Sequence, residues 1–339
     1  MPIGTTITEF IIQEQRRMKN VTGNFTALIN DVVIACKSIS SAVRYGSLVG
    51  VLGTADTENI QGETQKKLDV ISNNLFIRRT EWGGQVAGLA SEEMNNVYQL
   101  PLQYPRGKYL LVFDPLDGSS NSDVNGAVGT IFSILRRPDD SSGEPTEEDF
   151  LQPGTRQVCG GYALYGPSTM MVLTTGHGVN GFTLDQRIGE FILTNPDMRI
   201  PEDSHDFSIN ASYMRFWDPP VRRYIDECLA GREGPRRKDF NMRWAGAMIA
   251  DIHRVLCQGG VFMYPIDRKL RAKNQEGKLR LLYEANPMSF IVEQAGGLST
   301  TGTQRIMELE PTGLHQRCSV IMGSKSEVER IISYHLEAQ

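Results

Sequence analysis

The chain has 339 residues, room for one large α/β unit or about two domains, and its 40% hydrophobic content excludes a disordered protein. A net charge of −5 argues against a nucleic-acid binder, which would normally carry a basic face, so we expect no nucleic-acid partner. The five cysteines are scattered and form no CxxC pair, which argues against a disulfide framework and against a zinc site.

The N-terminal segment MPIGTTITEF lacks the basic region and apolar run of a signal peptide. No stretch of the sequence indicates a membrane span. We therefore expect a cytoplasmic protein without a membrane partner.

The N-terminal quarter is predicted to contain three helices, with one glycine-rich segment between the second and the third. Apolar residues at three- and four-residue spacing predict a short helix from residue 7 and a longer one over 28–43, with its start at 22–24. The glycine-rich stretch 45–62 predicts a loop, which we expect to close over a site. A third helix is predicted over 63–79.

Strands follow the third helix. The runs VAGLA (86–90) and YLLVF (109–113) predict buried strands, and both end in acidic residues. Another strand is predicted at 130–135, before a polar segment at 138–149 that predicts a solvated loop.

The second half alternates strands with helices. A hairpin is predicted over 159–175. Further strands are expected at 182–185, 190–195, 261–265 and 318–322. Helices are expected at 221–229 and 244–257, and a strand is expected to pass into a helix at 278–297. The last helix is predicted to be capped by 324–327. This order predicts an α/β (α+β) fold with a boundary near residue 200, which divides the chain into halves 1–200 and 201–339.

Acidic residues recur at the predicted strand and helix ends, where a turn of the chain lets neighbours converge. They are Glu63, Asp69, Glu92, Glu93, Asp114, Asp117 and Glu284. Their carboxylates would repel one another without cations, and oxygen-only ligands favour Mg²⁺ or Mn²⁺. For any single pair the alternative is an ordinary surface acid at a strand end.

The segment DPLDGSS at 114–120 is more specific than the other acids. Pro115 restricts Asp114 to an extended conformation, and Gly118 permits a tight turn after Asp117. The backbone N–H groups of Gly118, Ser119 and Ser120 could then hold a phosphate.

The motifs together resemble a known family. DPLDGSSN with the preceding SEE is similar to the lithium-sensitive sugar phosphatases, which include inositol monophosphatases. The segments ISSAVR, KKLDV, KYLLVFDPLDGSSN, DFLQPG, GYALYGPSTM, MIADIHR and GKLRLLYEANPMSF resemble class I fructose-1,6-bisphosphatases of the bacterial type, collinearly from residue 5 to about 332. The resemblance implies a layered αβαβα fold and hydrolysis of the 1-phosphate of fructose 1,6-bisphosphate in gluconeogenesis.

The resemblance also implies the site residues. Two to three Mg²⁺ or Mn²⁺ ions per subunit would be held by Glu92, Glu93, Asp114, Asp117, Glu284 and the Leu116 carbonyl. Asp69, Glu93 and Glu63 would be catalytic, with Glu63 and Asp69 joining the site when the loop closes. The 1-phosphate would lie against Gly118 and Ser119, with Asp117 and Ser120 also binding substrate. The sugar and the 6-phosphate would contact Asn210, Tyr213, Tyr264, Lys278 and Arg243, the last from a neighbouring subunit of a homotetramer.

An AMP inhibition site is implied at Thr22, Gly23, Thr26, Lys108, Tyr109 and Arg136. The chain departs from the family at Asn24 in this region, at Ser122 and Trp244, and in a longer stretch at 267–276. The alternatives are a bifunctional fructose- and sedoheptulose-bisphosphatase, an inositol monophosphatase and a non-catalytic metabolite-binding regulator.

Overall fold

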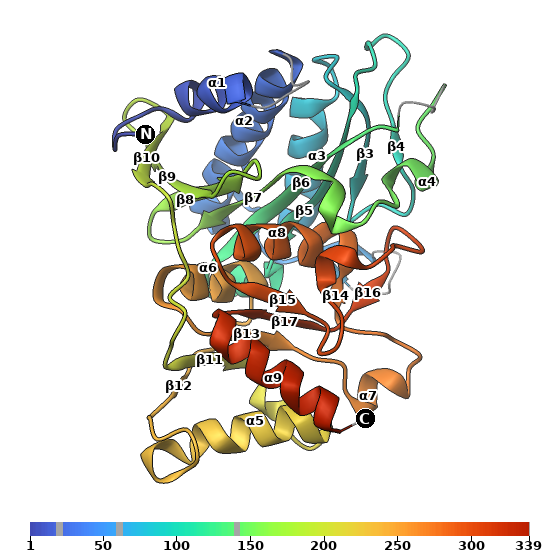
Figure 1. The fold of residues 1–339 in the computed structure, drawn as a ribbon. Coiled ribbons are helices and arrows are strands. Elements are labelled where there is room, and N and C mark those ends of the chain that lie inside the picture. The colour runs from blue at the N-terminus through green and yellow to red at the C-terminus, as the bar shows by residue number, and fades with distance from the viewer. Residues whose placement is uncertain (18–22, 59–63, 139–142, 339) are drawn as a thin grey trace.

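The computed structural model describes residues 1–17, 23–58, 64–138 and 143–338. Helices and two sheets alternate in five layers, as Figure 1 shows from α1–α3 at the top to α5 and α9 at the bottom. This arrangement confirms the predicted layered αβαβα fold.

The larger sheet has eight strands in the order β10-β9-β8-β7-β6-β5-β3-β4, and β3 and β5 are its parallel pair. Its strands are β3 (Val86–Ser91), β4 (Tyr98–Gln99), β5 (Tyr109–Asp117), β6 (Val128–Arg136), β7 (Gln157–Tyr165), β8 (Thr169–Thr174), β9 (Val179–Asp185) and β10 (Glu190–Asn195). β5 is buried along its whole length and continues to Asp117, four residues beyond the expected end, and the predicted turn follows at Gly118.

Three helices cover the outer face of the larger sheet: α1 (Ile7–Arg17), α2 (Gly23–Tyr45) and α3 (Lys67–Thr80). Their apolar residues form one buried cluster with the inward side chains of the strands. The rings of Phe76 on α3 and Phe113 on β5 stack with centroids 4.3 Å apart, which holds α3 over the end of β5.

One described helical stretch, 23–49, is long and apolar enough to cross a membrane by length and composition, contrary to the expectation from the sequence. Half of its 18-residue window is buried within the fold. Because a core helix of a soluble protein passes the same test, this single stretch is weak evidence for a membrane span.

The segment predicted as a loop contains regular structure. It holds a 3₁₀ turn η1 (Gly46–Val49) and strand β1 (Thr54–Glu58), which pairs with β2 (Thr64–Lys66). α3 therefore begins at Lys67, later than predicted, because Lys66 is extended and its N–H donates to Asp69 Oδ2 over 2.7 Å. Glu63 lies outside the described residues.

The second half contains a five-stranded sheet in the order β12-β11-β13-β17-β15. Its strands are β11 (Asp206–Ile209), β12 (Asn241–Met242), β13 (Val261–Tyr264), β15 (Leu298–Thr300) and β17 (Val320–Gly323), and β14 (Leu279–Arg280) pairs separately with β16 (Arg317–Cys318). All strands of the larger sheet precede residue 200 and all strands of the smaller one follow it. As a domain division, the boundary near residue 200 stays a prediction.

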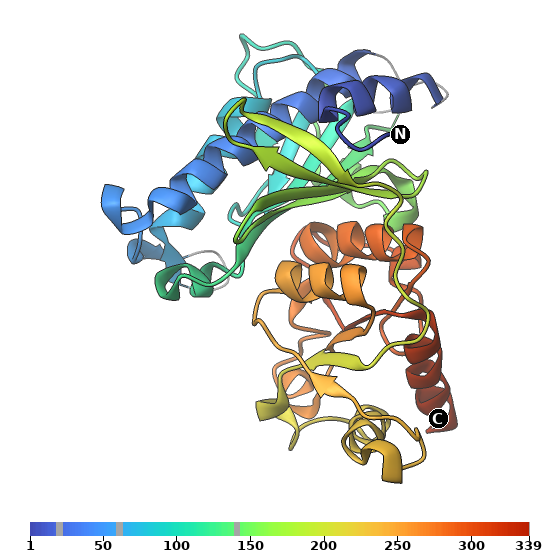
Figure 2. The ribbon, with the colours of Figure 1, turned by 90° about the vertical axis from the view of Figure 1, so that its left-hand side faces the viewer.

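Helices α6 (Met248–Gln258) and α8 (Asn286–Gln294) lie between the two sheets, and α5 (Pro219–Leu229) and α9 (Lys325–Glu337) cover the far face (Figure 2). Two further helices are short: α4 (Glu147–Phe150) begins in the segment predicted to be a solvated loop, and α7 (Arg268–Arg271) lies in the stretch that is longer than in the family. α6 begins at Met248 and not at Trp244, which leaves the indole on a loop.

Ser324 is the N-cap residue of α9, as predicted, but the predicted side-chain cap does not form. Ser324 Oγ makes no cap bond; it donates to Pro201 O over 2.6 Å and accepts from the Gly260 N–H over 2.9 Å.

Candidate active site

A cleft of about 450 Å³ lies where the ends of β3 and β5 meet the second half of the chain. It is lined by Gln65, Asp69, Glu92, Glu93, Asp114, Leu116, Asp117, Gly118, Ser119, Ser120, Asn210, Trp244, Gly246, Met248, Tyr264, Lys278, Leu279, Arg280 and Glu284. The fold therefore brings most of the predicted site residues into one cavity, from segments more than two hundred residues apart.

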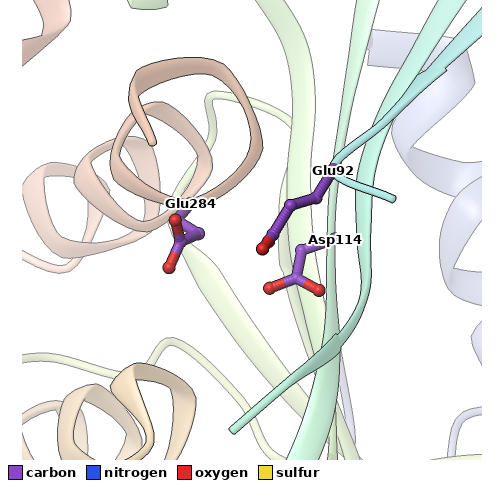
Figure 3. Close-up of side chains that lie close together, drawn as sticks. All are labelled: Glu92, Asp114 and Glu284. Carbon is purple, nitrogen blue, oxygen red and sulfur yellow. The ribbon is translucent and has the colours of Figure 1, made fainter. Parts of the chain in front are cut away.

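Three carboxylates form the centre of the cleft. Glu92 follows β3, Asp114 lies in β5, and Glu284 lies in the π-helical turn η6 (Leu281–Ala285). One ligand oxygen from each lies within 4.8 Å of the others, and Figure 3 shows the three side chains converging. Asp117 lies beside them, and its Oδ2 accepts the Ile249 N–H at the start of α6 over 2.7 Å.

Arg280 is the buried cation of this cluster, and the sequence analysis missed it. Its Nη1 lies 2.6 Å from Glu92 Oε1, and its backbone N–H donates to Glu284 Oε2 over 2.6 Å. An arginine four residues before a proposed ligand was the available signal, but the sequence does not show that Arg280 is buried.

Burial raises the pKa of these carboxyl groups. It raises the pKa of Glu92 to about 8, with Arg280 opposing the rise and Glu284 adding to it. It raises the pKa of Asp117 to about 7, again with repulsion from Glu284. The pKa values of Asp114 and Glu284 are also raised, by burial first.

Arg280, even with Lys278 and Arg317 also lowering the pKa of Glu284, leaves the pKa values of these buried carboxylates raised. Divalent cations would offset them, and oxygen donors without histidine suit hard ions such as Mg²⁺ and Mn²⁺. The donor set present in the cleft thus fits the predicted ions. Leu116 is buried and lines the cleft between Asp114 and Asp117, and its carbonyl as a metal ligand stays a prediction.

Asp69 faces the cleft from the first turn of α3. Its Oδ2 accepts the Lys66 N–H, whereas Oδ1 is buried without a hydrogen-bond partner in the described part of the chain. Burial raises the pKa of Asp69 to about 7; the Lys66 N–H opposes the rise, Glu93 adds to it, and the Ser119 hydroxyl nearby opposes it. A carboxylate with a pKa near 7 and one unbonded oxygen is suited to accept a proton.

The turn that directly follows Asp117 offers backbone donors to the cleft. Gly118 has φ +74, and a Cβ there would lie 2.4 Å from Ala247 Cβ, so this position requires glycine. The 3₁₀ turn η2 (Ser119–Val124) begins directly after it, and Ser119 and Ser120 line the cleft with Gly118. This turn is the predicted phosphate cradle.

Asn210, Tyr264 and Lys278 also line the cleft, and Lys278 lies near enough to Glu284 to lower the pKa of that carboxyl group. Their contacts with the sugar and its second phosphate stay a prediction. Trp244 also lines the cleft, with its ring parallel to that of Phe262 at 6.2 Å between centroids.

Two predicted substrate residues do not line this cleft. Tyr213 lies with its ring 4.8 Å from Lys269 Nζ. Arg243 is half exposed beside Asp206, at 4.0 Å. Its predicted role from a neighbouring subunit stays a prediction.

The residues predicted to bind AMP lie at the other end of the N-terminal half. The ring centroids of Phe25 and Tyr109 lie 5.9 Å apart, and the Arg136 guanidinium lies 5.9 Å above the Tyr109 ring. Gly23 begins α2, and the Thr26 hydroxyl bonds to Gln15. Lys108 is exposed just before β5, and Thr22 lies outside the described residues. The AMP site itself stays a prediction.

Convergent carboxylates that share a cleft with backbone N–H donors are the arrangement expected of a phosphatase that works with divalent cations. Residues 5–196 match the N-terminal domain of fructose-1,6-bisphosphatase, and residues 200–336 match its C-terminal domain. The chain belongs to the class 1 fructose-1,6-bisphosphatase family.

Two relatives illustrate how far the likeness extends. The class 1 fructose-1,6-bisphosphatase of Halorhodospira halophila is 60% identical over 338 residues, which cover 99% of this chain and all of that protein. The crystal structure of Leishmania major fructose-1,6-bisphosphatase in holo form superimposes with a TM-score of 0.90 at 42% identity, covering 98% of this chain and 99% of that one.

Proposed function

We propose that the protein hydrolyses the 1-phosphate of fructose 1,6-bisphosphate to fructose 6-phosphate and phosphate, as a step of gluconeogenesis. The observation that carries the proposal is the cleft in which the cluster of Glu92, Asp114 and Glu284 meets both Asp69 and the Gly118 turn. Class 1 membership supports the same reaction.

Two to three Mg²⁺ or Mn²⁺ ions would be held by Glu92, Glu93, Asp114, Asp117, Glu284 and the Leu116 carbonyl. When bound, such ions would neutralise the charge of the phosphate and lower the pKa of a bound water molecule.

The chain's own residues bind the substrate and accept the proton. The N–H groups of the Gly118 turn hold the oxygens of the 1-phosphate, and the Lys278 ammonium attracts the second phosphate. Asp69 Oδ1 accepts the proton of the water that attacks phosphorus in line, with the Glu93 carboxylate beside it. Glu63 is proposed to join them. No cysteine or histidine nucleophile is required.

Phosphate release tests the reaction. We expect fast release from fructose 1,6-bisphosphate with Mg²⁺ and loss of release with EDTA, because the carboxylates then repel one another and the substrate. Equal release from sedoheptulose 1,7-bisphosphate would indicate the bifunctional alternative, and preference for inositol 1-phosphate would contradict the proposal. No release from any of the three would favour a metabolite-binding regulator.

Inhibition by AMP at the α2 end is a second proposal, supported by the contact between Arg136 and Tyr109. Arg136→Ala is expected to raise the AMP concentration for half inhibition by about tenfold or more, because a charge-assisted hydrogen bond contributes about 1.5–3 kcal/mol. Arg187→Ala, in the exposed turn between β9 and β10, is the control. No effect of AMP on the unmodified enzyme at millimolar concentration would contradict the proposal.

We also propose a cytoplasmic homotetramer in which Arg243 completes the site of a neighbouring subunit. The half-exposed position of Arg243 outside the cleft of its own chain supports this assembly.

A further inference from the structure

Gln65 lines the cleft, and no feature of the sequence pointed to it. It lies in the middle of β2, four residues before Asp69. Its Nε2 donates to Glu93 Oε2 over 2.5 Å, across 28 residues of sequence. A neutral amide thus contacts one of the carboxylates proposed to act in catalysis.

The hairpin of β1 and β2 fixes the direction of this side chain. Successive residues of a strand point to opposite sides, so Gln65 faces the cleft while Lys66 faces away. Lys66 Nζ lies 2.7 Å from Asp123 Oδ2, and the Gly53 N–H donates to Asp123 Oδ1 over 3.0 Å. Asp123 lies in η2, directly after the phosphate cradle, so the hairpin is attached to the cradle on one side and to Glu93 on the other.

We propose that Gln65 is a positioning residue that holds Glu93 Oε2 and thereby directs the other carboxylate oxygen toward the cation and water positions of the cleft. The inference rests on the proposed function, since it assigns the reaction's metal ligands to this cleft. Gln65 acts through Glu93 and takes no part in proton transfer.

A neutral donor suits this position better than a charged one. Arg280 already contacts Glu92 at 2.6 Å, and a second cation beside the carboxylates would compete with divalent ions for the same oxygens. An amide N–H fixes the orientation of a carboxylate without cancelling its charge. Residues that orient metal ligands in this way typically change metal affinity or activity by about 10–100-fold when they are replaced.

Gln65→Met tests the inference, because methionine keeps the length of the side chain and removes the donor. We expect Mn²⁺, used alone as the probe, to bind about 10–100-fold more weakly to the full-length variant, measured by electron paramagnetic resonance. We expect kcat to fall, with KM for fructose 1,6-bisphosphate within about threefold of the unmodified enzyme. Gln13→Met is the matched control: Gln13 donates to Glu9 over 3.0 Å on the exposed face of α1, and its replacement should change neither value.

A double-mutant cycle with Glu93→Gln separates positioning from a general structural effect. If Gln65 acts through Glu93, Gln65→Met should weaken Mn²⁺ binding by less than about threefold in the Glu93→Gln background. The same loss in both backgrounds, or no loss in the native one, would overturn the inference. Phosphate release by the unmodified enzyme is assayed in parallel: its absence would contradict the proposed function, whereas its presence without coupling would contradict only the role of Gln65.

Discussion

Replacing Asp69 with asparagine is expected to lower kcat for fructose 1,6-bisphosphate by about 10²–10⁴-fold, the usual contribution of a general base. Asp69 Oδ2 accepts the Lys66 N–H at the start of α3, and an amide oxygen can keep that bond. The amide NH₂ then takes the place of Oδ1 in the cleft, where it cannot accept a proton. Steady-state assays with saturating Mg²⁺ should show a lower kcat with KM within about threefold.

The control is Asp185→Asn, because Asp185 pairs with Arg187 in an exposed turn outside the cleft. Its kcat should match that of the unmodified enzyme. The thermal unfolding midpoint of Asp69→Asn should stay close to the unmodified value or rise, since the substitution removes a buried group with a raised pKa. Near-normal turnover of Asp69→Asn would show that another group accepts the proton.

Without divalent cations, the protein is expected to lose stability as pH rises from about 5 to 8. Burial raises the pKa values of Asp69 and Asp117 to about 7 and that of Glu92 to about 8. In the unfolded chain these groups titrate near 4, so across this range the folded protein holds protons that the unfolded chain has released. Stability is therefore fully present below the unfolded pKa and is lost as pH passes through the folded pKa values.

We expect the thermal unfolding midpoint in EDTA to fall by about 4–7 °C between pH 5 and pH 8, which corresponds to about 3–5 kcal/mol for a chain of this length. Saturating Mg²⁺ should remove most of this fall, because cations favour the ionised carboxylates. Differential scanning calorimetry at both pH values, with and without Mg²⁺, measures the effect.

Asp114→Asn is the informative variant for this effect. It removes one buried charge from the cluster, so it should raise the midpoint in EDTA at pH 8 while abolishing phosphate release. The same pH dependence in EDTA for the unmodified protein and for Asp114→Asn would contradict the account of the cluster.

Much of the fold followed from local patterns in the sequence. Apolar runs and helical spacing predicted β3, β5, α1 and α2, because each of these elements buries its own apolar residues. The patterns did not predict the hairpin of β1 and β2, whose strands are short and polar and which is stabilised by distant contacts such as Lys66 with Asp123. The start of α3 was placed too early for the same reason.

The features of the site also divide into those that local sequence predicted and those that depend on long-range contacts. DPLDGSS by itself determined where two of the acids and the tight turn lie, because proline restricts the backbone and glycine permits the positive φ of the turn. Only the tertiary structure decided that Glu284 lies beside Glu92 and Asp114, that Arg280 is buried among them, and that Gln65 contacts Glu93. These contacts join segments 28 to nearly 200 residues apart. Residue types and their spacing indicate which chemical groups the site contains. Burial and long-range contacts decide the protonation and the orientation of those side chains.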